Sequence, residues 1–113
     1  MVEQAQRTAE LLPGDIGKKK YCEKLVETAV KKLRHVDIVV NNAGFQRTYD
    51  DVADVPEDEF EKTFRTNVFG TFFLSQAAAA VIPRGGSIIN TCSIQAYEPS
   101  EICWRVLRPR PRW

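Results

Sequence analysis

The sequence predicts an α/β fold with parallel strands, because apolar runs typical of buried strands alternate with amphipathic helical segments. The predicted order along the 113 residues is strand, helix, strand, helix, strand. With 43% hydrophobic and 27% charged residues, the composition is that of a soluble globular domain with a modest core.

The first three elements are predicted in the N-terminal part of the chain. Residues 8–12 form a short strand that Pro13 and Gly14 close. Residues 18–34 form a helix, because apolar residues recur every three or four positions while lysines and glutamates fill the other face. Residues 36–40 are β-branched except for Asp37 and show little alternation, which is typical of a strand buried on both faces of a parallel sheet.

The remaining two elements follow a polar loop at residues 45–55. Pro56 and the three acidic residues after it favour the first turn of a second, longer helix. Its apolar spacing continues to Ile82, where prolines and glycines end it. Residues 87–92 predict the third strand, again of the buried type.

Several classes of protein are disfavoured by the composition. No apolar run approaches the roughly 20 residues of a membrane-spanning helix, and the N-terminal residues lack the plan of a secretory signal. We therefore expect a cytoplasmic protein without membrane association. The three cysteines, Cys22, Cys92 and Cys103, are odd in number and widely spaced, so neither a disulfide framework nor a metal site is expected. We interpret them as small, buried or half-buried thiols.

The net charge of +1 conceals a basic tail at residues 101–113, which carries four arginines against one glutamate and leaves −2 for the first hundred residues. The predicted organisation is a domain at residues 1–100 and a tail outside its fold. Arginine, proline and tryptophan in this proportion suggest the hypothesis of a G/C-rich gene read out of frame. A nucleic-acid contact is the alternative, but the tail lacks a folded platform, so no nucleic-acid partner is expected.

Polar residues follow each of the three predicted strands, where ligands of doubly wound sheets bind. They lie at residues 14–16, 41–44 and 91–93. Each group also has a purely structural interpretation, because a glycine can serve a backbone turn, an asparagine can bind loop amides and a serine can cap a helix.

Four segments occur in a distinctive order: Asp15-Ile16 ahead of a helix, DIVVNNAG at residues 37–44, RTNVFG at 65–70 and GGSIINTCS at 85–93. Together they resemble the central part of a short-chain dehydrogenase/reductase. SIQAYEPS at residues 93–100 is most similar to the glucose and ribitol dehydrogenase-like branch. The resemblance covers residues 8–100 and implies a partial Rossmann fold, doubly wound with a parallel sheet, that binds NAD or NADP.

The resemblance assigns a first group of residues to the nucleotide. Asp15 and the backbone of Ile16 would contact the adenine ring. The residues implied to lie along the adenosine ribose are Asn42, Ala43 and Gly44. Asn41 would brace the central sheet.

A second group is implied to act in catalysis. Asn67 resembles the asparagine that interrupts the long helix of the family and helps to hold a water in a proton relay. It stands among Phe64, Val68 and Phe72 on an expected packed face, where a buried amide without partners costs about 1–3 kcal/mol. Its amide should therefore have a partner. Ser93 resembles the serine that hydrogen-bonds the substrate hydroxyl or carbonyl.

Two motifs of the family are absent from the sequence. No Gly-x-x-x-Gly-x-Gly occurs, the turn that binds the pyrophosphate at a helix N-terminus. None of the three tyrosines has a lysine four residues later, so the proton-exchanging Tyr-x-x-x-Lys pair is missing too. The sequence thus predicts a fragment of an NAD(P)-dependent oxidoreductase that acts on an alcohol or carbonyl substrate. The fragment is expected to be inactive by itself. The resemblance also implies homo-oligomers, the usual assembly of the family. The alternative is a non-catalytic nucleotide-binding or interaction module.

Overall fold

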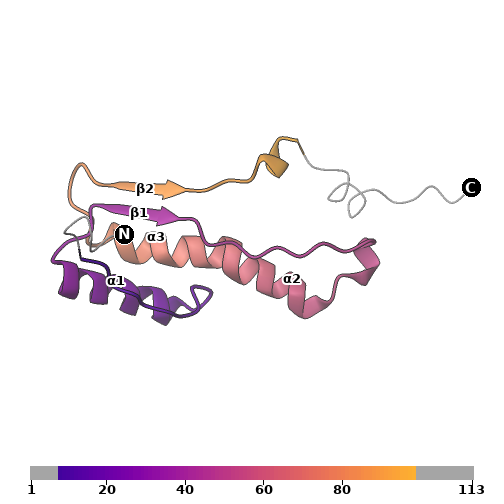
Figure 1. Ribbon diagram of the computed structural model, residues 1–113, viewed down its shortest axis with the longest axis horizontal. Coiled ribbons are helices and arrows are strands. Elements are labelled where there is room, and N and C mark those ends of the chain that lie inside the picture. The colour runs from indigo at the N-terminus through magenta and orange to yellow at the C-terminus, as the bar shows by residue number, and fades with distance from the viewer. Residues whose placement is uncertain (1–7, 99–113) are drawn as a thin grey trace, which may run out of the picture.

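The computed structural model describes residues 8–98, and two parallel strands lie on one layer of helices (Figure 1). In chain order the elements are α1 (Lys19–Leu33), β1 (Ile38–Asn41), a 3-10 turn (Val52–Asp54), α2 (Glu57–Phe64), a π-helical turn (Arg65–Gly70, the π turn), α3 (Thr71–Ala79), β2 (Ser87–Asn90) and a second 3-10 turn (Ile94–Ala96). The predicted α/β class with parallel strands is confirmed. The basic tail at residues 101–113 and Cys103 lie outside the described residues.

Helix α1 confirms the prediction for residues 18–34 to within a residue at each end. It ends at Arg34, whose φ of 77° lies in the left-handed region. Lys31 and Lys32 occupy its last turn, where cations interact favourably with the helix dipole. His35 follows, and its Nε2 lies 3.0 Å from the Asp37 carboxylate.

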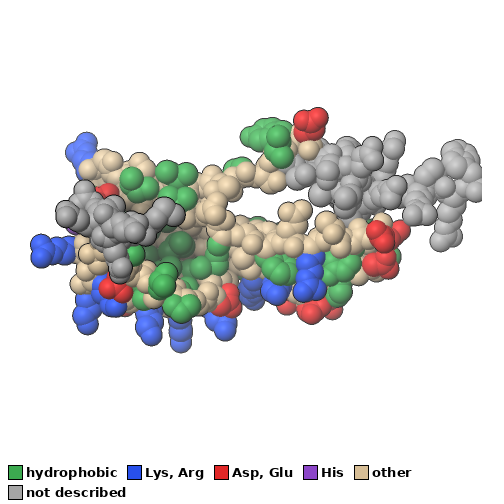
Figure 2. Space-filling view, viewed as in Figure 1, with side chains coloured by type: hydrophobic (Ala, Val, Ile, Leu, Met, Phe, Trp, Pro, Cys, Tyr) green, Lys and Arg blue, Asp and Glu red, His purple; other side chains and the backbone are tan. Residues whose placement is uncertain are grey.

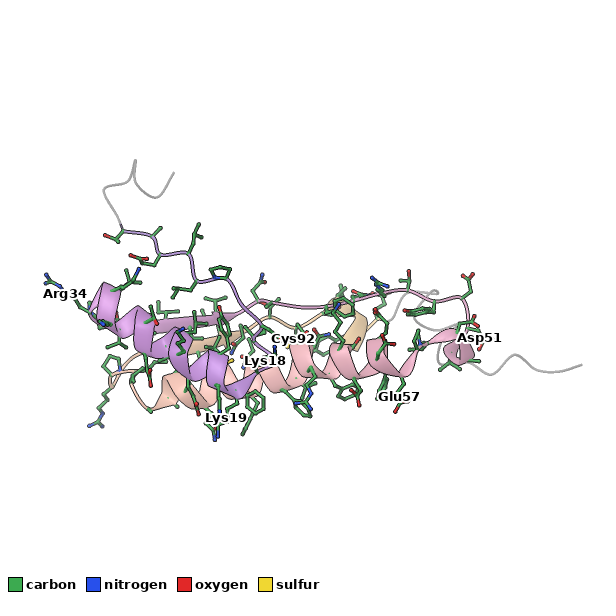
Figure 3. All side chains as sticks on the ribbon, turned by 90° about the horizontal axis from the view of Figure 1, so that it is seen from below. Lys18, Lys19, Arg34, Asp51, Glu57 and Cys92 are labelled. Carbon is green, nitrogen blue, oxygen red and sulfur yellow. The ribbon has the colours of Figure 1, made fainter. Side chains whose placement is uncertain are left out.

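The second predicted helix is continuous but not uniform. Helices α2 and α3 are joined through the π turn, which includes Asn67, so the interruption implied by the family resemblance is present. Acidic residues fill the first turn of α2, where they complement the dipole: Glu57, Asp58 and Glu59. Figure 2 shows basic side chains along α1 and acidic ones at the start of α2. In Figure 3, Arg34 marks the end of α1 and Glu57 the start of α2.

The core lies between the sheet and the helices. Val26 of α1, Val39 of β1 and Ala78 of α3 are buried against one another. Four half-buried residues surround them: Val36, Leu74, Ala77 and Ile82. Helix α3 thus packs beneath β1, while α2 extends past the carboxyl ends of the strands (Figure 1).

The prediction that both strands are buried on both faces is wrong for the described residues. Val39 is 8% exposed, whereas its neighbours Ile38 and Val40 are 61% and 55% exposed. In β2, Ile88 and Ile89 are also exposed. Within residues 8–98, helices cover only one face of the sheet, so the apolar character that suggested double burial leaves an open apolar face instead.

The strand predicted at residues 8–12 is also absent, because this segment has no regular secondary structure. A strand needs a hydrogen-bonded neighbour, and within residues 8–98 the sheet contains only β1 and β2. The segment is held to α1 by side chains instead. The Tyr21 hydroxyl donates to the Leu12 carbonyl, and Lys32 Nζ lies 2.7 Å from Glu10 Oε2.

The two faces of β1 can be compared by making the same Val→Thr substitution at a buried and at an exposed position. Val39→Thr places a hydroxyl in the core and is expected to lower the free energy of unfolding by about 1–3 kcal/mol. Val40→Thr keeps the β-branched shape at an exposed position and should change it by less than about 0.5 kcal/mol. Urea unfolding followed by circular dichroism at low protein concentration measures both. An equal loss in the two variants would mean that the second face is covered in solution.

Candidate functional site

The carboxyl ends of the two strands form the first part of the site. Because β1 and β2 pair in parallel from Ile38–Ser87 to Asn41–Asn90, the residues that follow them meet at one edge. The Thr91 N–H donates to the Asn41 carbonyl over 3.0 Å, and the Thr91 hydroxyl donates to Asn42 Oδ1 over 3.1 Å. Two of the three polar strand ends expected from the sequence are therefore joined.

Asn41 is the buried polar residue at this edge. Its Nδ2 donates to Asn90 Oδ1 over 2.8 Å and to Ser75 Oγ over 3.0 Å. Both amide hydrogens are thus used, which offsets the cost of burying the group. Asn41 ties β1 both to β2 and to α3, and residues 42–44 leave the sheet from this fixed point.

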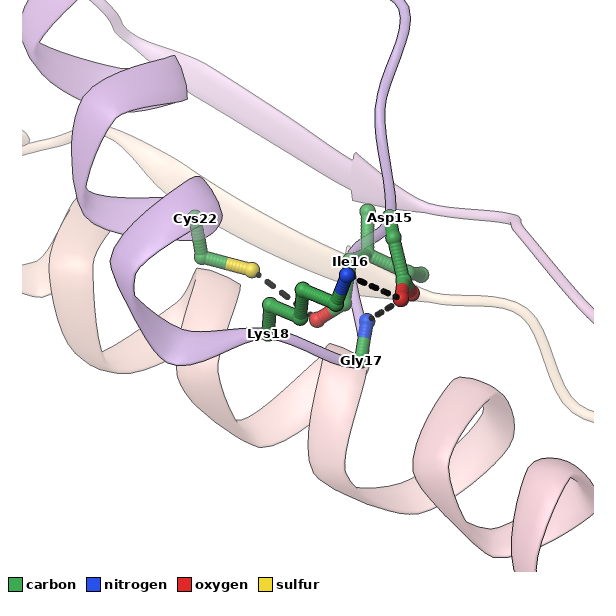
Figure 4. Close-up of polar contacts among 5 residues, drawn as sticks. All are labelled: Asp15, Ile16, Gly17, Lys18 and Cys22. Atoms are coloured by element: carbon green, nitrogen blue, oxygen red, sulfur yellow. Dashed lines mark hydrogen bonds and ion pairs between the residues drawn. The ribbon is translucent and has the colours of Figure 1, made fainter.

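Residues 15–17 form a tight turn before α1, named here the 15–17 turn (Figure 4). Asp15 Oδ1 accepts the Gly17 N–H over 2.9 Å, and Oδ2 lies 3.8 Å from Lys18 Nζ. The Cys22 thiol donates to the Ile16 carbonyl over 3.1 Å. The side chain of Asp15 remains more than half exposed, so its carboxylate is open to a further hydrogen-bond donor.

The two described cysteines differ in environment. Cys22 is buried as expected, and burial raises the pKa of its thiol, with the nearby carboxylates of Asp15 and Glu23 raising that pKa further. Cys22 is therefore a neutral hydrogen-bond donor rather than a nucleophile. Cys92 is exposed, contrary to the expectation of a buried thiol, because it follows the exposed strand β2.

The 15–17 turn packs against the π turn at both of its ends. A Cβ on Gly17 would lie 3.2 Å from the Arg65 carbonyl oxygen. A Cβ on the buried Gly70 would lie 2.8 Å from both Cγ1 and Cδ1 of Ile16, closer than real side chains approach. Glycine at these two positions permits the close contact. The third polar segment expected from the sequence, residues 14–16, thus joins the site through the long helix.

Asn67 makes two hydrogen bonds with one backbone residue. Its Nδ2 donates to the Phe45 carbonyl over 2.8 Å, and its Oδ1 accepts the Phe45 N–H over 2.7 Å. The amide thus pairs with Phe45 as a neighbouring strand would. It fixes the segment that follows Gly44 to the π turn.

The surroundings of Asn67 differ from the packed face expected from the sequence. Phe64, Val68 and Phe72 are 45%, 49% and 59% exposed, and Asn67 is itself exposed. The reason is that this part of the helix extends beyond the sheet, where the described chain supplies no second layer. The expected partner for the amide exists, but it is the Phe45 backbone.

The other residues implied by the resemblance lie at the surface near the strand ends. Ala43 and Gly44 are exposed, and a Cβ on Gly44 would lie 3.9 Å from Asn67 Oδ1. Ser93 is exposed, and its carbonyl accepts the Ala96 N–H over 3.1 Å at the start of the second 3-10 turn.

Contacts that the sequence did not indicate hold the loop after Phe45. Arg47 Nη1 lies 3.3 Å from Oε1 of Glu59, whose side chain is only 14% exposed. Lys62 Nζ lies 4.2 Å from the centre of the Phe45 ring. These partners are distant in sequence and carry no local signal. Gly70, in contrast, stands inside a helical pattern, which is a weak local signal of close packing.

Within residues 8–98, no three His, Cys, Asp or Glu side chains converge to hold a metal ion. A membrane span would need a longer and more apolar helix than any in this range.

Comparison with known proteins gives a consistent family. The family model described as short chain dehydrogenase matches residues 1–103. The chain is 46% identical over 100 residues to the uncharacterised oxidoreductase YghA of Escherichia coli (strain K12), covering 88% of this chain and 34% of that protein. It is 38% identical over 87 residues to the glucose and ribitol dehydrogenase of Daucus carota, covering 77% and 30%.

Solved structures share the arrangement of the elements. A short chain dehydrogenase from Burkholderia cenocepacia in complex with NADP matches with a TM-score of 0.84 at 29% identity, covering 89% of this chain and 41% of that one. A blue fluorescent protein from a metagenomic library, in complex with NADPH, matches with a TM-score of 0.81 at 34% identity, covering 88% and 40%. The chain thus spans about a third of the length of its curated relatives. The expected partial Rossmann fold is confirmed.

The hydrogen bonds of Asn67 can be tested with two substitutions. Asn67→Ala removes both partners of Phe45 and should lower the free energy of unfolding by about 1–2 kcal/mol. The Phe45 amide should also exchange its hydrogen several-fold faster, as measured by NMR. Asn67→Asp keeps the acceptor and should retain part of the protection.

Thr71→Ala is the matched control, because the Thr71 hydroxyl donates to the Asn67 carbonyl and not to its side chain. It should leave Phe45 exchange unchanged. Wild-type exchange at Phe45 in Asn67→Ala would contradict the assigned pairing.

Proposed function

The chain belongs to the short-chain dehydrogenase family, and we propose that it forms the adenosine-binding and substrate-orienting part of an NAD(P)-dependent oxidoreductase acting on an alcohol or carbonyl group. The proposal covers residues 1–100 as a partial NAD(P)-binding domain, with residues 101–113 outside its fold. The proposal includes a cytoplasmic location, a small-molecule substrate and homo-oligomeric assembly, and the family membership supports the small-molecule substrate.

One observation carries the proposal most directly. The resemblance assigns two segments to the nucleotide, the 15–17 turn and residues 42–44. The first packs directly against the π turn, and the second is joined to it through Phe45, the residue after Gly44. Segments separated by more than twenty residues are thereby brought to one structural element, as a shared ligand requires. The NADP and NADPH in the two solved relatives support this cofactor class.

The chemistry of these residues fits the adenosine part of the cofactor. Asp15 retains an exposed carboxylate, a suitable acceptor for the amino group of adenine. The exposed backbone of Ala43 and Gly44 is open to a ribose. These residues include no turn that would bind the pyrophosphate, because the sequence contains no Gly-x-x-x-Gly-x-Gly.

Asn67 and Ser93 would act on the substrate side. The Asn67 amide keeps a second hydrogen and a second lone pair beyond its two bonds to Phe45, so it retains capacity to hold a water. Ser93 would orient the substrate oxygen through its hydroxyl. The nicotinamide, when bound, supplies the hydride chemistry. The acid-base tyrosine and its lysine are absent from these 113 residues, so turnover by this chain alone is not expected.

Ligand-observed NMR with NADP⁺ and NAD⁺ tests the nucleotide site. Saturation transfer should be strongest at the adenine protons and weak at the nicotinamide, because only the adenosine contacts are present. Asp15→Ala should reduce the adenine signal several-fold. Asp54→Ala, which removes an acid from the first 3-10 turn, is the control and should leave it unchanged. Equal transfer to both halves of the cofactor would contradict the proposal.

A second candidate is a non-catalytic nucleotide-binding or interaction module, which the missing Tyr-x-x-x-Lys pair favours. Both candidates predict adenine contacts, but only the oxidoreductase predicts a substrate contact at Ser93. Saturation transfer to a panel of small alcohols and aldehydes in the presence of NADP⁺, lost in Ser93→Ala, supports the oxidoreductase. Nucleotide binding without any such contact supports the module.

A further inference from the structure

The 15–17 turn packs against both ends of the π turn. Gly17 approaches Arg65 and Ile16 approaches Gly70, the first and last residues of the π turn. The Ile16 carbonyl is also held by the Cys22 thiol over 3.1 Å, so the turn is fixed between α1 and the π turn. Its position therefore depends on the shape of the helix at Gly70.

The same π turn holds the second segment through Asn67. The two hydrogen bonds between the Asn67 amide and the Phe45 backbone fix the residue that directly follows Gly44. Asn67 lies between Arg65 and Gly70 in sequence. A change in the π turn should therefore reach Phe45 as well as Ile16.

We propose that the π turn couples these two segments and that Gly70 is a positioning residue, whose missing side chain sets how closely Ile16 packs and so where Asp15 stands relative to residues 42–44. The proposal rests on the function proposed above, since only a shared cofactor makes this spacing matter. Gly70 itself would touch no ligand.

The tightness of the contact explains why a small change should be felt. An alanine at 70 would place its Cβ 2.8 Å from two carbons of Ile16 and 3.3 Å from its carbonyl oxygen. Ile16 can relieve this clash by rotating its side chain or by moving its carbonyl away from the Cys22 thiol. The helix can yield by shifting the π turn, and that shift moves Asn67 with it. In either case the distance between the two segments changes.

Amide hydrogen exchange, measured by NMR on the full chain, reads both segments without a ligand. The first reporter is the Gly17 N–H, which donates a hydrogen bond to Asp15 Oδ1. The second is the Phe45 N–H, which donates a hydrogen bond to Asn67 Oδ1. Each rate is divided by that of Val26 in the core, which removes a change in global stability. Gly70→Ala should raise both ratios several-fold.

Gly86→Ala is the matched control. Its Cβ would lie 2.3 Å from Ile82 and 2.6 Å from the Asp37 carbonyl, in the turn before β2 and away from the π turn. It should destabilise the fold while leaving both exchange ratios unchanged. Adding Ile16→Ala to Gly70→Ala makes room for the new methyl group and should return the Phe45 ratio toward the wild-type value.

A rise at Gly17 with no change at Phe45 would show a local packing contact and overturn the coupling. If Gly70→Ala does not fold, Ile16→Val removes one of the two contacting carbons and must move both ratios in the same direction for the proposal to stand.

Saturation transfer from the chain to the adenine of NADP⁺ separates this proposal from the proposed function. A several-fold loss in Gly70→Ala supports positioning, and unchanged binding overturns it. If the wild-type chain shows no adenine contact while both exchange ratios still rise, the coupling stands and the proposed function fails.

Discussion

The rest of the structure depends on the π turn in the long helix. Before it, α2 runs past the sheet and holds the loop that follows β1; after it, α3 packs beneath β1 through Ala78. A π-helical turn is rare and occurs frequently at functional sites. Its weaker backbone geometry persists here because packing compensates for it: Ile16 on Gly70 on one side and the Phe45 backbone on Asn67 on the other.

The strand ends are fixed by a different device, a buried amide with all of its hydrogens used. Asn41 is buried at the end of β1, and its amide donates hydrogen bonds to Asn90 and Ser75. In a low dielectric an amide that lost these partners would be costly, so the network favours one arrangement of β1, β2 and α3. The next residue, Asn42, then leaves the sheet in a defined direction and meets Thr91.

What could be predicted from the sequence follows from how local each interaction is. Helix α1 was predicted closely because its periodicity and basic last turn lie within its own residues. The prediction of a strand at residues 8–12 is wrong, because a strand depends on a hydrogen-bonded neighbour that its own sequence does not reveal. Family resemblance placed Asn67 in a helix interruption, but its partner Phe45 lies 22 residues away and left no pattern. The close packing at Gly70 and Gly17 has only a weak signal in the sequence, namely a glycine inside one helical pattern and another just before the other helix.

The groups at the 15–17 turn and the π turn are suited to hydrogen bonding rather than to proton transfer. Cys22, the one buried ionisable group near the 15–17 turn with a shifted pKa, has that pKa raised, so it donates a hydrogen bond instead of exchanging a proton near neutral pH. The carboxylate of Asp15 bonds to the Gly17 N–H, and the Asn67 amide does not titrate. In the proposed function the acid-base step belongs to the Tyr-x-x-x-Lys pair that the resemblance implies, and these 113 residues do not contain it. The π turn contacts the 15–17 turn and, through Phe45, the segment after Gly44. Under the proposed function it would position the residues that bind the cofactor, and the acid-base step would come from a separate group.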